Sequence, residues 1–218
     1  MRVGVIDYGV GNLGSVIRAL EDLRVAPVLV KKPLEMRNMD SFILPGVGNF
    51  GDCARLLVKD GWFEALIEEV GDGQKSLLGV CLGMQMLASS SMEGAEGGAS
   101  ESIAGLGLIP GRVERLSSLG CKLRVPHIGW NEVSCRPGVD AEGGGLFDGI
   151  PDLTDFYFVH SYAFVPDDPF DMLATTDYGV PITAAVRRGR VWGTQFHPEK
   201  SSRAGFRLLR NFIHCASC

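Results

Sequence analysis

Short apolar runs rich in β-branched residues alternate with longer stretches of helical pattern along the first half of the chain. Four such runs read as strands, at positions 3–7, 27–30, 41–44 and 76–80. After the first run, Val16, Leu20 and Leu23 recur at helical spacing, and a second helical pattern covers 56–67. This alternation is typical of βαβ units, so it predicts an α/β protein with a mostly parallel central sheet flanked by helices.

The pattern changes after residue 88. Positions 89–101 are rich in Ser, Gly, Glu and Ala without apolar periodicity, and 136–149 contain three consecutive glycines, so both segments are predicted to be surface loops. Shorter apolar runs at 112–116, 129–134, 156–160, 182–187 and 191–196 predict antiparallel strands added to the parallel core, and 203–214 predict a final helix. The whole chain, 1–218, is expected to form one domain.

Composition narrows the classes of function. The 218 residues carry a formal net charge of -5 and no block of Lys or Arg, which argues against a nucleic-acid partner. No apolar run approaches the roughly 20 residues that span a bilayer, and the first residues do not resemble a secretion signal. We therefore expect a soluble protein of the cytoplasm.

The chain has six cysteines, and a reducing compartment makes free thiols the expected state. Cys215 and Cys218 form a C-x-x-C pair near the end of the chain. Because no second pair of ligands accompanies it, we predict no metal site there and assign the pair no role.

One cysteine lies in a position suited to a nucleophile. The sequence GVCLG at 79–83 follows a buried-looking strand and precedes the apolar helix residues Met86 and Leu87. It is the thiol counterpart of the nucleophile elbow, in which small residues on each side of a sharp strand-to-helix turn project the reactive group. The N-terminus of the following helix would favour a thiolate at Cys81 and hold an oxyanion. The alternative is a buried structural cysteine.

A thiol nucleophile needs a base, and His197 is the best placed of four histidines. It follows the apolar run 191–196 and begins His197-Pro198-Glu199, where an extended chain would place residues i and i+2 on one side. Glu199 would then orient the imidazole and stabilise its cation, and Pro198 would stiffen the pair. His160 and His127 are rival bases, and a surface His and Glu at a strand end is the simpler alternative.

Two motifs together resemble the class I (triad) glutamine amidotransferases. GVCLGMQ at 79–85 and QFHPE at 195–199 occur in the order that this family uses, and PGVG at 45–48 is similar to its oxyanion strand. The resemblance covers nearly the whole chain and implies a flavodoxin-like α/β fold. It also implies that Cys81, His197 and Glu199 form a catalytic triad, with the backbone N–H groups of Val47 and Leu82 as oxyanion donors.

Further segments resemble one branch of that class, the glutaminase subunits of imidazole glycerol phosphate synthases in histidine biosynthesis. These segments are 7–12, 45–51, 126–131, 156–162, 174–177 and 195–201. By this resemblance, the amino-acid part of glutamine is contacted by five residues, namely Gly48, Gln85, Glu93, Ser161 and Tyr162.

The same resemblance implies a heterodimer with a cyclase subunit, a (β/α)₈ barrel that receives the ammonia. Asn12, Trp130, Tyr157 and Lys200 would face this partner and gate the passage of ammonia. The simpler interpretation of Trp130 and Tyr157 is that they are core aromatics. No metal or organic cofactor is implied.

Three other functions stay open at this point. The chain resembles class I subunits that serve purine, anthranilate, aminodeoxychorismate or vitamin B6 synthesis, although PHIGWN at 126–131 and Lys200 favour the histidine pathway. A Cys/His hydrolase on a flavodoxin-like sheet, such as a peptidase or deglycase, is a rival from another enzyme class. A non-catalytic scaffold is the third, and the presence of all three triad residues argues against it.

Overall fold

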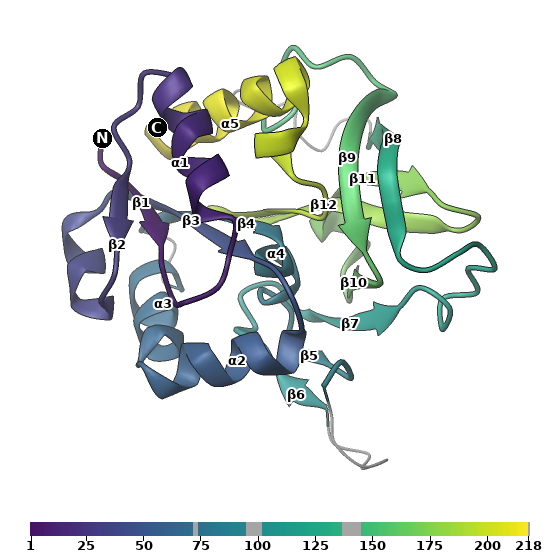
Figure 1. Cartoon of the computed structure of the whole chain (residues 1–218), viewed down its shortest axis with the longest axis horizontal. Helices are drawn as coiled ribbons and strands as arrows, with labels where there is room; N and C mark the ends of the chain where they lie inside the picture. The colour runs from purple at the N-terminus through teal and green to yellow at the C-terminus, as the bar shows by residue number, and fades with distance from the viewer. Residues whose placement is uncertain (72–73, 95–101, 137–144, 218) are drawn as a thin grey trace.

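The computed structural model describes residues 1–71, 74–94, 102–136 and 145–217. A nine-stranded sheet of order β2-β1-β3-β4-β13-β12-β11-β8-β9 forms its centre (Figure 1). The strands in this order are β2 (Val28–Val30), β1 (Val3–Ile6), β3 (Ser41–Gly46), β4 (Ser76–Cys81), β13 (Val191–Thr194), β12 (Pro181–Arg188), β11 (Met172–Asp177), β8 (His127–Cys135) and β9 (Thr154–His160).

The strands from β2 to β13 pair in parallel, and those from β13 to β9 pair antiparallel. The predicted parallel core with antiparallel strands added in the C-terminal half is therefore confirmed. A second, four-stranded sheet was not predicted. It has the order β10-β7-β5-β6 and consists of β10 (Tyr162–Pro166), β7 (Gly111–Arg115), β5 (Ser90–Ser91) and β6 (Ile103–Ala104).

Helices cover both faces of the parallel half of the central sheet. α1 (Leu13–Asp22) and α5 (Ser202–Ser217) lie on one face, and α2 (Phe50–Lys59) and α3 (Trp62–Val70) lie on the other (Figure 1). α2 and α3 occupy the region predicted as one helical pattern, and Gly61 separates them in a left-handed conformation with φ 76°. A glycine adopts this conformation without a steric penalty, so the break falls there.

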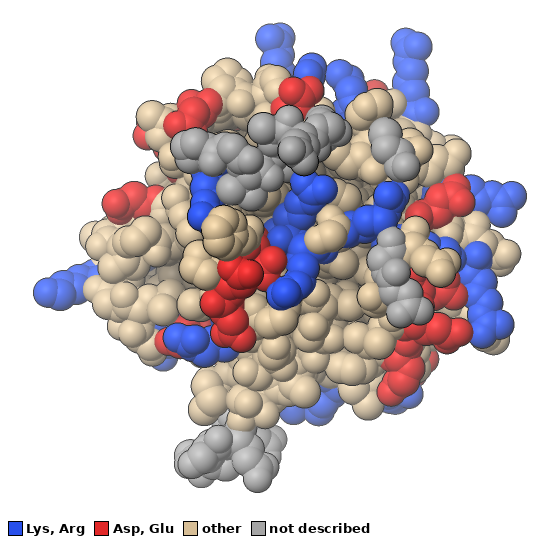
Figure 2. Space-filling view, turned by 180° about the vertical axis from the view of Figure 1, so that it is seen from behind, with Lys and Arg blue, Asp and Glu red and all other residues tan. Residues whose placement is uncertain are grey.

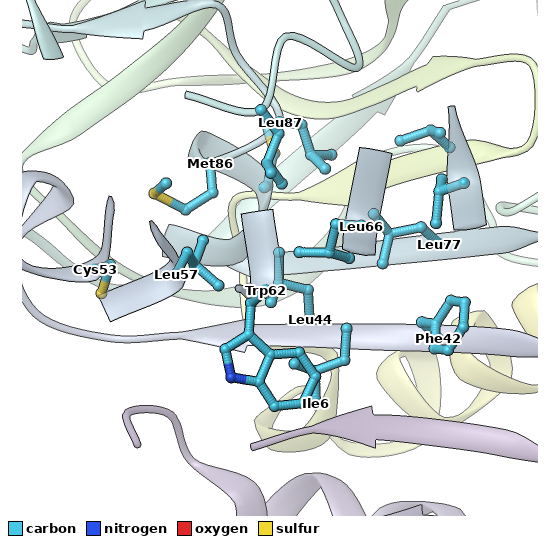
Figure 3. Close-up of a cluster of buried hydrophobic side chains, with 14 of the residues drawn as sticks. Ile6, Phe42, Leu44, Cys53, Leu57, Trp62, Leu66, Leu77, Met86 and Leu87 are labelled. Atoms are coloured by element: carbon cyan, nitrogen blue, oxygen red, sulfur yellow. The ribbon is translucent and has the colours of Figure 1, made fainter. Parts of the chain in front are cut away.

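The core has two layers because every residue of β3 and β4 is buried. Phe42 and Leu44 point into the layer under α2 and α3, where they belong to the same buried cluster as Trp62 and Leu66 (Figure 3). Ile43, between them, points into the layer under α1 and α5. Continuous apolar runs of this kind are expected for parallel strands that are covered on both faces.

β10 was not predicted, whereas the strand expected at 156–160 ends at His160, where β9 ends. A single residue, Ser161, lies between them, yet β9 ends the central sheet and β10 belongs to the second one. No Gly, Pro, Asn or Asp marks the turn at Ser161, so the sequence gave no sign that a second strand begins directly after it. β11 was also not predicted. It lies between β12 and β8 in the sheet, but its Ala and Thr residues form no apolar pattern that would mark a strand in the sequence.

The predicted loops lie only partly within the described residues. In the loop predicted at 89–101, residues 90 and 91 form strand β5, and residues 95–101 lie outside the described residues. In the loop predicted at 136–149, residues 137–144 lie outside the described residues. Cys218 lies outside them as well. Within the described part of the chain, no helix is long and apolar enough to cross a membrane.

The face seen in Figure 2 carries basic and acidic side chains beside one another. At its centre, several basic side chains lie together, with acidic side chains directly beside them.

Candidate active site

Cys81 lies at the end of β4 in a strained turn. Its φ of 56° and ψ of -111° are unusual for a residue with a side chain, and α4 (Leu82–Gln85) begins directly after it. Glycines on each side make the turn possible. A Cβ added to Gly79 would lie 2.6 Å from the Gly83 oxygen, and one added to Gly83 would lie 1.8 Å from the Leu44 oxygen. The elbow predicted from GVCLG is thus present in the backbone.

The helix after Cys81 is shorter than predicted. α4 contains four residues, and Met86 and Leu87 follow it outside the helix. Because a helix dipole sums over aligned peptides, a single turn supplies little of the charge that was expected to stabilise a thiolate.

Sheet order brings the two distant motifs together. β13 pairs in parallel with β4, with Thr194 opposite Val80, so the residues that follow these strands leave the sheet at the same edge. Gln195 therefore lies beside Cys81, and its Nε2 is 3.9 Å from the Cys81 sulfur. On the other side, β3 places Gly46 opposite Cys81, so Val47 follows beside Leu82.

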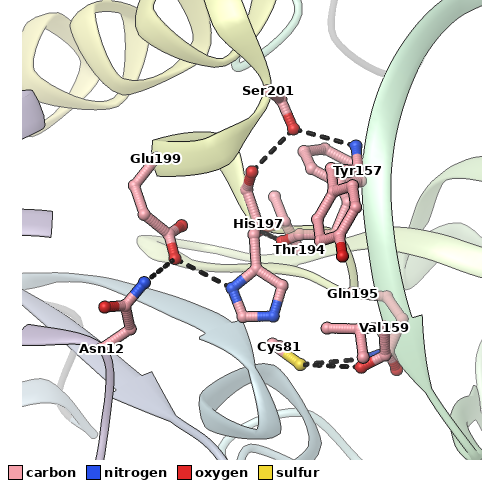
Figure 4. A network of polar contacts seen from close by, with 10 residues as sticks. Asn12, Cys81, Tyr157, Val159, Thr194, Gln195, His197, Glu199 and Ser201 are labelled. Carbon is pink, nitrogen blue, oxygen red and sulfur yellow. Dashed lines mark hydrogen bonds and ion pairs between the residues drawn. The ribbon is translucent and has the colours of Figure 1, made fainter. Parts of the chain in front are cut away.

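His197 and Glu199 form a close pair. His197 Nδ1 lies 2.9 Å from Glu199 Oε1, and Asn12 Nδ2 donates to the same oxygen at 3.3 Å (Figure 4). The predicted geometry was wrong in detail, since Pro198–Lys200 is a 3₁₀ turn and not extended chain. The strand ends at Thr194, and the turn, with Pro198 at its first position, folds the carboxylate back onto the ring.

The other imidazole nitrogen has no hydrogen-bond partner in the described part of the chain. His197 Nε2 and Glu199 Oε2 are both buried and unpaired there. Figure 4 shows the ring edge that carries Nε2 turned toward the sulfur of Cys81. Burial by itself would lower the pKa of His197, but Cys81 and Glu199 outweigh it and raise this pKa from 6.5 to about 9.

Backbone contacts fix the position of His197. Its N–H donates to the Tyr157 carbonyl at 2.9 Å, and its carbonyl accepts from the Ser201 hydroxyl at 2.6 Å. Ser201 Oγ in turn accepts from the Tyr157 N–H at 3.0 Å. Sequence reasoning gave Ser201 no role, since one buried hydroxyl carries no pattern of its own.

A cavity of about 310 Å³ opens over Cys81. Its lining contains every residue that was expected to form the oxyanion site or to bind substrate, together with Cys81 and His197. Pro126, Val159 and His160 also line it and were not predicted as site residues. The complete lining is Val47, Gly48, Cys81, Leu82, Gln85, Glu93, Pro126, Val159, His160, Ser161, Tyr162 and His197.

Two of the expected substrate contacts also bond within the protein. Gln85 is buried, and its Nε2 donates to the Tyr162 carbonyl at 3.0 Å and to Gln195 Oε1 at 2.9 Å. One oxygen of Glu93 accepts from the Phe50 N–H at 3.0 Å, at the start of α2. Burial raises the pKa of the Glu93 carboxyl, and the Phe50 hydrogen bond partly opposes this change.

The two rival bases bond to each other. His127 Nδ1 lies 3.0 Å from His160 Nε2, and burial lowers the pKa of each to about 4. Their ring nitrogens are thereby engaged away from the sulfur. Of the three histidines considered, His197 is the one whose free nitrogen faces Cys81.

Three of the four residues expected at a partner interface lie next to one another, and the fourth, Asn12, contacts the residue that precedes Lys200. Lys200 Nζ is 5.8 Å from the centre of the Tyr157 ring, and this ring packs edge-on against Trp130 at 6.0 Å. Asn12 contacts Glu199. Trp130 is 51% exposed, so it is not the core aromatic of the simpler interpretation.

A buried thiol and phenol lie under the predicted oxyanion strand and were missed by sequence reasoning. Cys53, on α2, donates to the Val47 carbonyl at 3.6 Å. Tyr8 is buried nearby, and burial and the adjacent Cys53 raise its pKa well above the usual value. Among residues 1–71, 74–94, 102–136 and 145–217, no group of three or more His, Cys, Asp or Glu is arranged to hold a metal.

Comparison with known proteins gives a family for nearly the whole chain. The model of the family "Glutamine amidotransferase class-I" matches residues 4–215. "Imidazole glycerol phosphate synthase subunit HisH" of Moorella thermoacetica is 45% identical over 211 residues, covering 96% of this chain and 93% of that protein. The protein of the same name from Halobacterium salinarum is 44% identical, covering 97% of this chain and 93% of that protein.

Solved structures agree on the fold at lower identity. The chain of a "Crystal structure of glutamine amidotransferase" has a TM-score of 0.71 at 24% identity, with 99% of each chain covered. A chain of the "Structure of PurLQS from Thermotoga maritima" has a TM-score of 0.72 at 18% identity, with 98% of each covered. With the matches above, this protein belongs to the class-I glutamine amidotransferase family, among the HisH subunits of imidazole glycerol phosphate synthase.

Proposed function

We propose that this protein hydrolyses glutamine at Cys81 and delivers the ammonia to a cyclase subunit. The observation that carries the proposal is the buried Nε2 of His197, which has no hydrogen-bond partner among the residues that the structure describes; its ring is fixed through Nδ1 by Glu199 and faces the Cys81 sulfur. An unsatisfied buried nitrogen costs stability, so its presence beside a thiol in a cavity favours a role in proton transfer.

In the first step, the Cys81 thiolate attacks the side-chain amide carbon of glutamine. His197 carries the proton, which fits a pKa raised to about 9. The Gln195 N–H is directed at the same sulfur, 3.9 Å away. The oxyanion that forms is held by the backbone N–H groups of Val47, which directly follows β3, and of Leu82, the first residue of α4, both in the lining of the cavity.

The tetrahedral adduct then collapses. His197 Nε2–H gives its proton to the departing nitrogen, which leaves as ammonia, and a γ-glutamyl thioester stays on Cys81. Water attacks the thioester while His197 takes up one of its protons. Glutamate is released and the thiolate and imidazolium are restored, so neither step requires an oxidant, a metal or a cofactor.

The polar lining suits the amino-acid part of glutamine. Because Gln85 Nε2 is engaged by Tyr162 and Gln195, its Oε1 is the atom left to accept from the substrate ammonium. Glu93 adds a carboxylate, and the backbone of Gly48, Ser161 and Tyr162 completes the wall. The cavity volume is near the lower end of the range usual for small-molecule sites.

The relatives are named as subunits of a synthase, which is the reason to propose a partner subunit for this chain. We assign to this chain a heterodimer with the cyclase subunit, a (β/α)₈ barrel, that makes imidazole glycerol phosphate and AICAR from PRFAR in the cytoplasm. Ammonia released in water is mostly protonated and has no lone pair for attack, so transfer through a closed interface preserves its reactivity. We assign the contact with this partner to Asn12, which bonds to Glu199, and to Lys200, Tyr157 and Trp130, which lie next to one another.

A glutaminase assay with matched partners tests the proposal. Ammonia release is measured for the chain alone, with the cyclase subunit, and with the cyclase and its nucleotide ligand. We expect strong stimulation by the last pair and no turnover in the Cys81→Ala variant under the same conditions. Stimulation by a synthase of another pathway would reassign the partner, and peptide cleavage without glutamine hydrolysis would refute the glutaminase.

A further inference from the structure

A chain of hydrogen bonds runs from the Cys81 cavity to the outer strand β8. Starting at the sulfur, it passes through Gln195, Gln85 and the Tyr162 carbonyl. His160, His127 and Asn131 continue it to the Asp177 carbonyl. The mechanism uses only the first members, and the histidine pair has no step in it.

The direction of each bond near the cavity is fixed by chemistry. A backbone carbonyl only accepts, so the atom of Gln85 that lies 3.0 Å from the Tyr162 oxygen is the amide nitrogen. The second hydrogen of the same nitrogen goes to Gln195 Oε1. Gln195 then has only its nitrogen to offer to the sulfur of Cys81.

The Tyr162 carbonyl also determines which ring nitrogens of His160 and His127 carry a hydrogen. It lies 2.8 Å from His160 Nδ1, which must therefore carry a hydrogen. In the neutral ring, His160 Nε2 is then an acceptor, so His127 Nδ1, 3.0 Å away, must carry a hydrogen too. His127 Nε2 is left as an acceptor and meets Asn131 Nδ2 at 3.4 Å.

The outer end of the chain is held by stacking and by a backbone acceptor. The His127 ring is stacked between Phe158 at 4.9 Å and Tyr178 at 3.9 Å. Asn131 Nδ2 also donates to the Asp177 carbonyl at 2.8 Å. Each donor in the series meets an acceptor, so a change at one member leaves a buried polar group unpaired.

We propose that His127 and His160 are positioning residues for glutamine binding, which hold the Tyr162 carbonyl and thereby aim Gln85 into the cavity. This inference rests on the proposed glutaminase function. Without His160, the Tyr162 carbonyl loses one of its two donors and the 161–162 turn between the two sheets loses a restraint. Gln85 would then be free to turn its amide away from the substrate.

The relay requires both rings to be neutral. A proton on His160 Nε2 would place it against the His127 Nδ1–H, and two donors cannot bond to each other. Burial lowers the pKa of both histidines to about 4, which keeps the pair neutral at physiological pH. The pair is therefore suited to a fixed structural function and not to proton transfer with the substrate.

Steady-state kinetics in complex with the cyclase subunit test the proposal. His160→Leu removes the donor and should raise the KM for glutamine by about tenfold, with kcat changed by less than about twofold, since one neutral hydrogen bond is lost and the triad stays intact. His160→Asn keeps a donor near the Nδ1 position and should restore KM to within about threefold of the wild type. His214→Asn is the matched control and should change neither value, because His214 is an exposed residue in the last turn of α5.

A second measurement does not depend on activity or on a folded variant. Nitrogen-15 NMR of the wild-type imidazoles at neutral pH should show both His127 and His160 as neutral rings protonated at Nδ1, the less common form of free histidine. An Nε2–H or charged ring at either position would overturn the relay. A kcat loss with unchanged KM in His160→Leu, or no difference between the Leu and Asn variants, would overturn the role in binding.

Failure of the proposed function would look different. If the wild-type complex released no ammonia from glutamine, the glutaminase itself would be refuted, whatever the ring protonation proved to be. The NMR result would then still decide whether the relay exists.

Discussion

At the scale of single residues, two opposing effects act on the charge of the His197 ring. Its ring is buried, which disfavours charge, yet it lies between the Cys81 thiol and the Glu199 carboxylate, which favour it. The two partners outweigh burial, and the folded protein therefore binds a proton on His197 more tightly than the unfolded chain does.

This difference predicts how stability depends on pH. Because the folded pKa of about 9 lies above the unfolded value of 6.5, the contribution of His197 is fully present below about pH 6.5 and is lost as the pH rises through 9. The unfolding free energy of the wild type relative to His197→Asn should fall across this window by an amount on the order of 3 kcal/mol. Urea denaturation at several pH values measures it.

The control for this experiment is the same comparison in a Cys81→Ala background. Removal of the thiol should reduce the pH dependence without abolishing it, because the Glu199 carboxylate remains. A difference between the two proteins that stays constant from pH 6 to 9.5 would contradict the raised pKa.

The backbone of Cys81 gives a second prediction at this scale. Its positive φ is costly for any residue with a Cβ and is free of that cost for glycine. Both Cys81→Gly and Cys81→Ala should be inactive, but the Gly variant should be more stable than the Ala variant by about 1 kcal/mol. Thermal unfolding of the two inactive proteins decides it, and equal stabilities would show that the turn is not strained.

At the scale of elements, the active site depends on how closely α4 approaches β3. No side chain fits at Gly83, because a Cβ there would lie 1.8 Å from the Leu44 carbonyl oxygen. A backbone atom cannot move aside as a flexible side chain can. The elbow that presents Cys81 and the strand that leads to Val47 must therefore shift together if this glycine is replaced.

We accordingly expect Gly83→Ala to destabilise the protein by at least about 2 kcal/mol and to abolish glutaminase activity. Gly14→Ala is the matched control, since Gly14 lies in α1 with no atom within 4 Å of an added Cβ. This control should raise stability by about 0.5–1 kcal/mol, because alanine favours the helix. Denaturant unfolding of both variants gives the two values, and a tolerated Gly83→Ala would refute the close packing.

β9 links several parts of the site. Tyr157 on this strand bonds to the His197 backbone, contacts Lys200 and packs on Trp130, while Val159 and His160 line the cavity. A partner that contacts Trp130 would therefore act on a strand that touches both the base and the substrate cavity.

At the scale of the whole molecule, β8 exposes apolar side chains near the cavity. Ile128 and Trp130 point outward from the strand and are 59% and 51% exposed, while His127 points inward. Exposed aromatic and aliphatic side chains beside a functional site are typical of protein interfaces. This face is the one on which we expect the cyclase subunit to bind.

Trp130→Ala should weaken the affinity for the cyclase subunit by at least about tenfold, because Trp residues dominate the energy of many interfaces. Its own unfolding free energy should change by less than about 0.5 kcal/mol, since the ring is half-exposed. Leu34→Ala is the control, because Leu34 is also exposed but follows β2 at the far side of the sheet. Calorimetric titration compares the variants, and unchanged affinity in Trp130→Ala would place the interface elsewhere.

Much of the fold was predictable from sequence, because the spacing of apolar residues and the positions of glycines reflect the local backbone conformation. Apolar runs marked β1, β3 and β4, and the glycines around Cys81 marked the elbow. The four-residue length of α4 and the turn at Ser161 were not predictable, because neither follows from a pattern along the chain. Both depend on which strands lie next to each other.

The sequence by itself determined the family and the identity of the candidate triad, since those residues lie in two short motifs that can be recognised along the chain without knowledge of its fold. Tertiary structure alone decided which histidine faces the thiol, how the 3₁₀ turn after His197 orients Glu199, and how Gln195, Gln85 and the His127–His160 pair connect. These contacts join residues up to 187 positions apart, as between Asn12 and Glu199. Local propensity cannot encode them, because they exist only once the parallel pairing of β4 with β13 has brought both strand ends to one edge of the sheet.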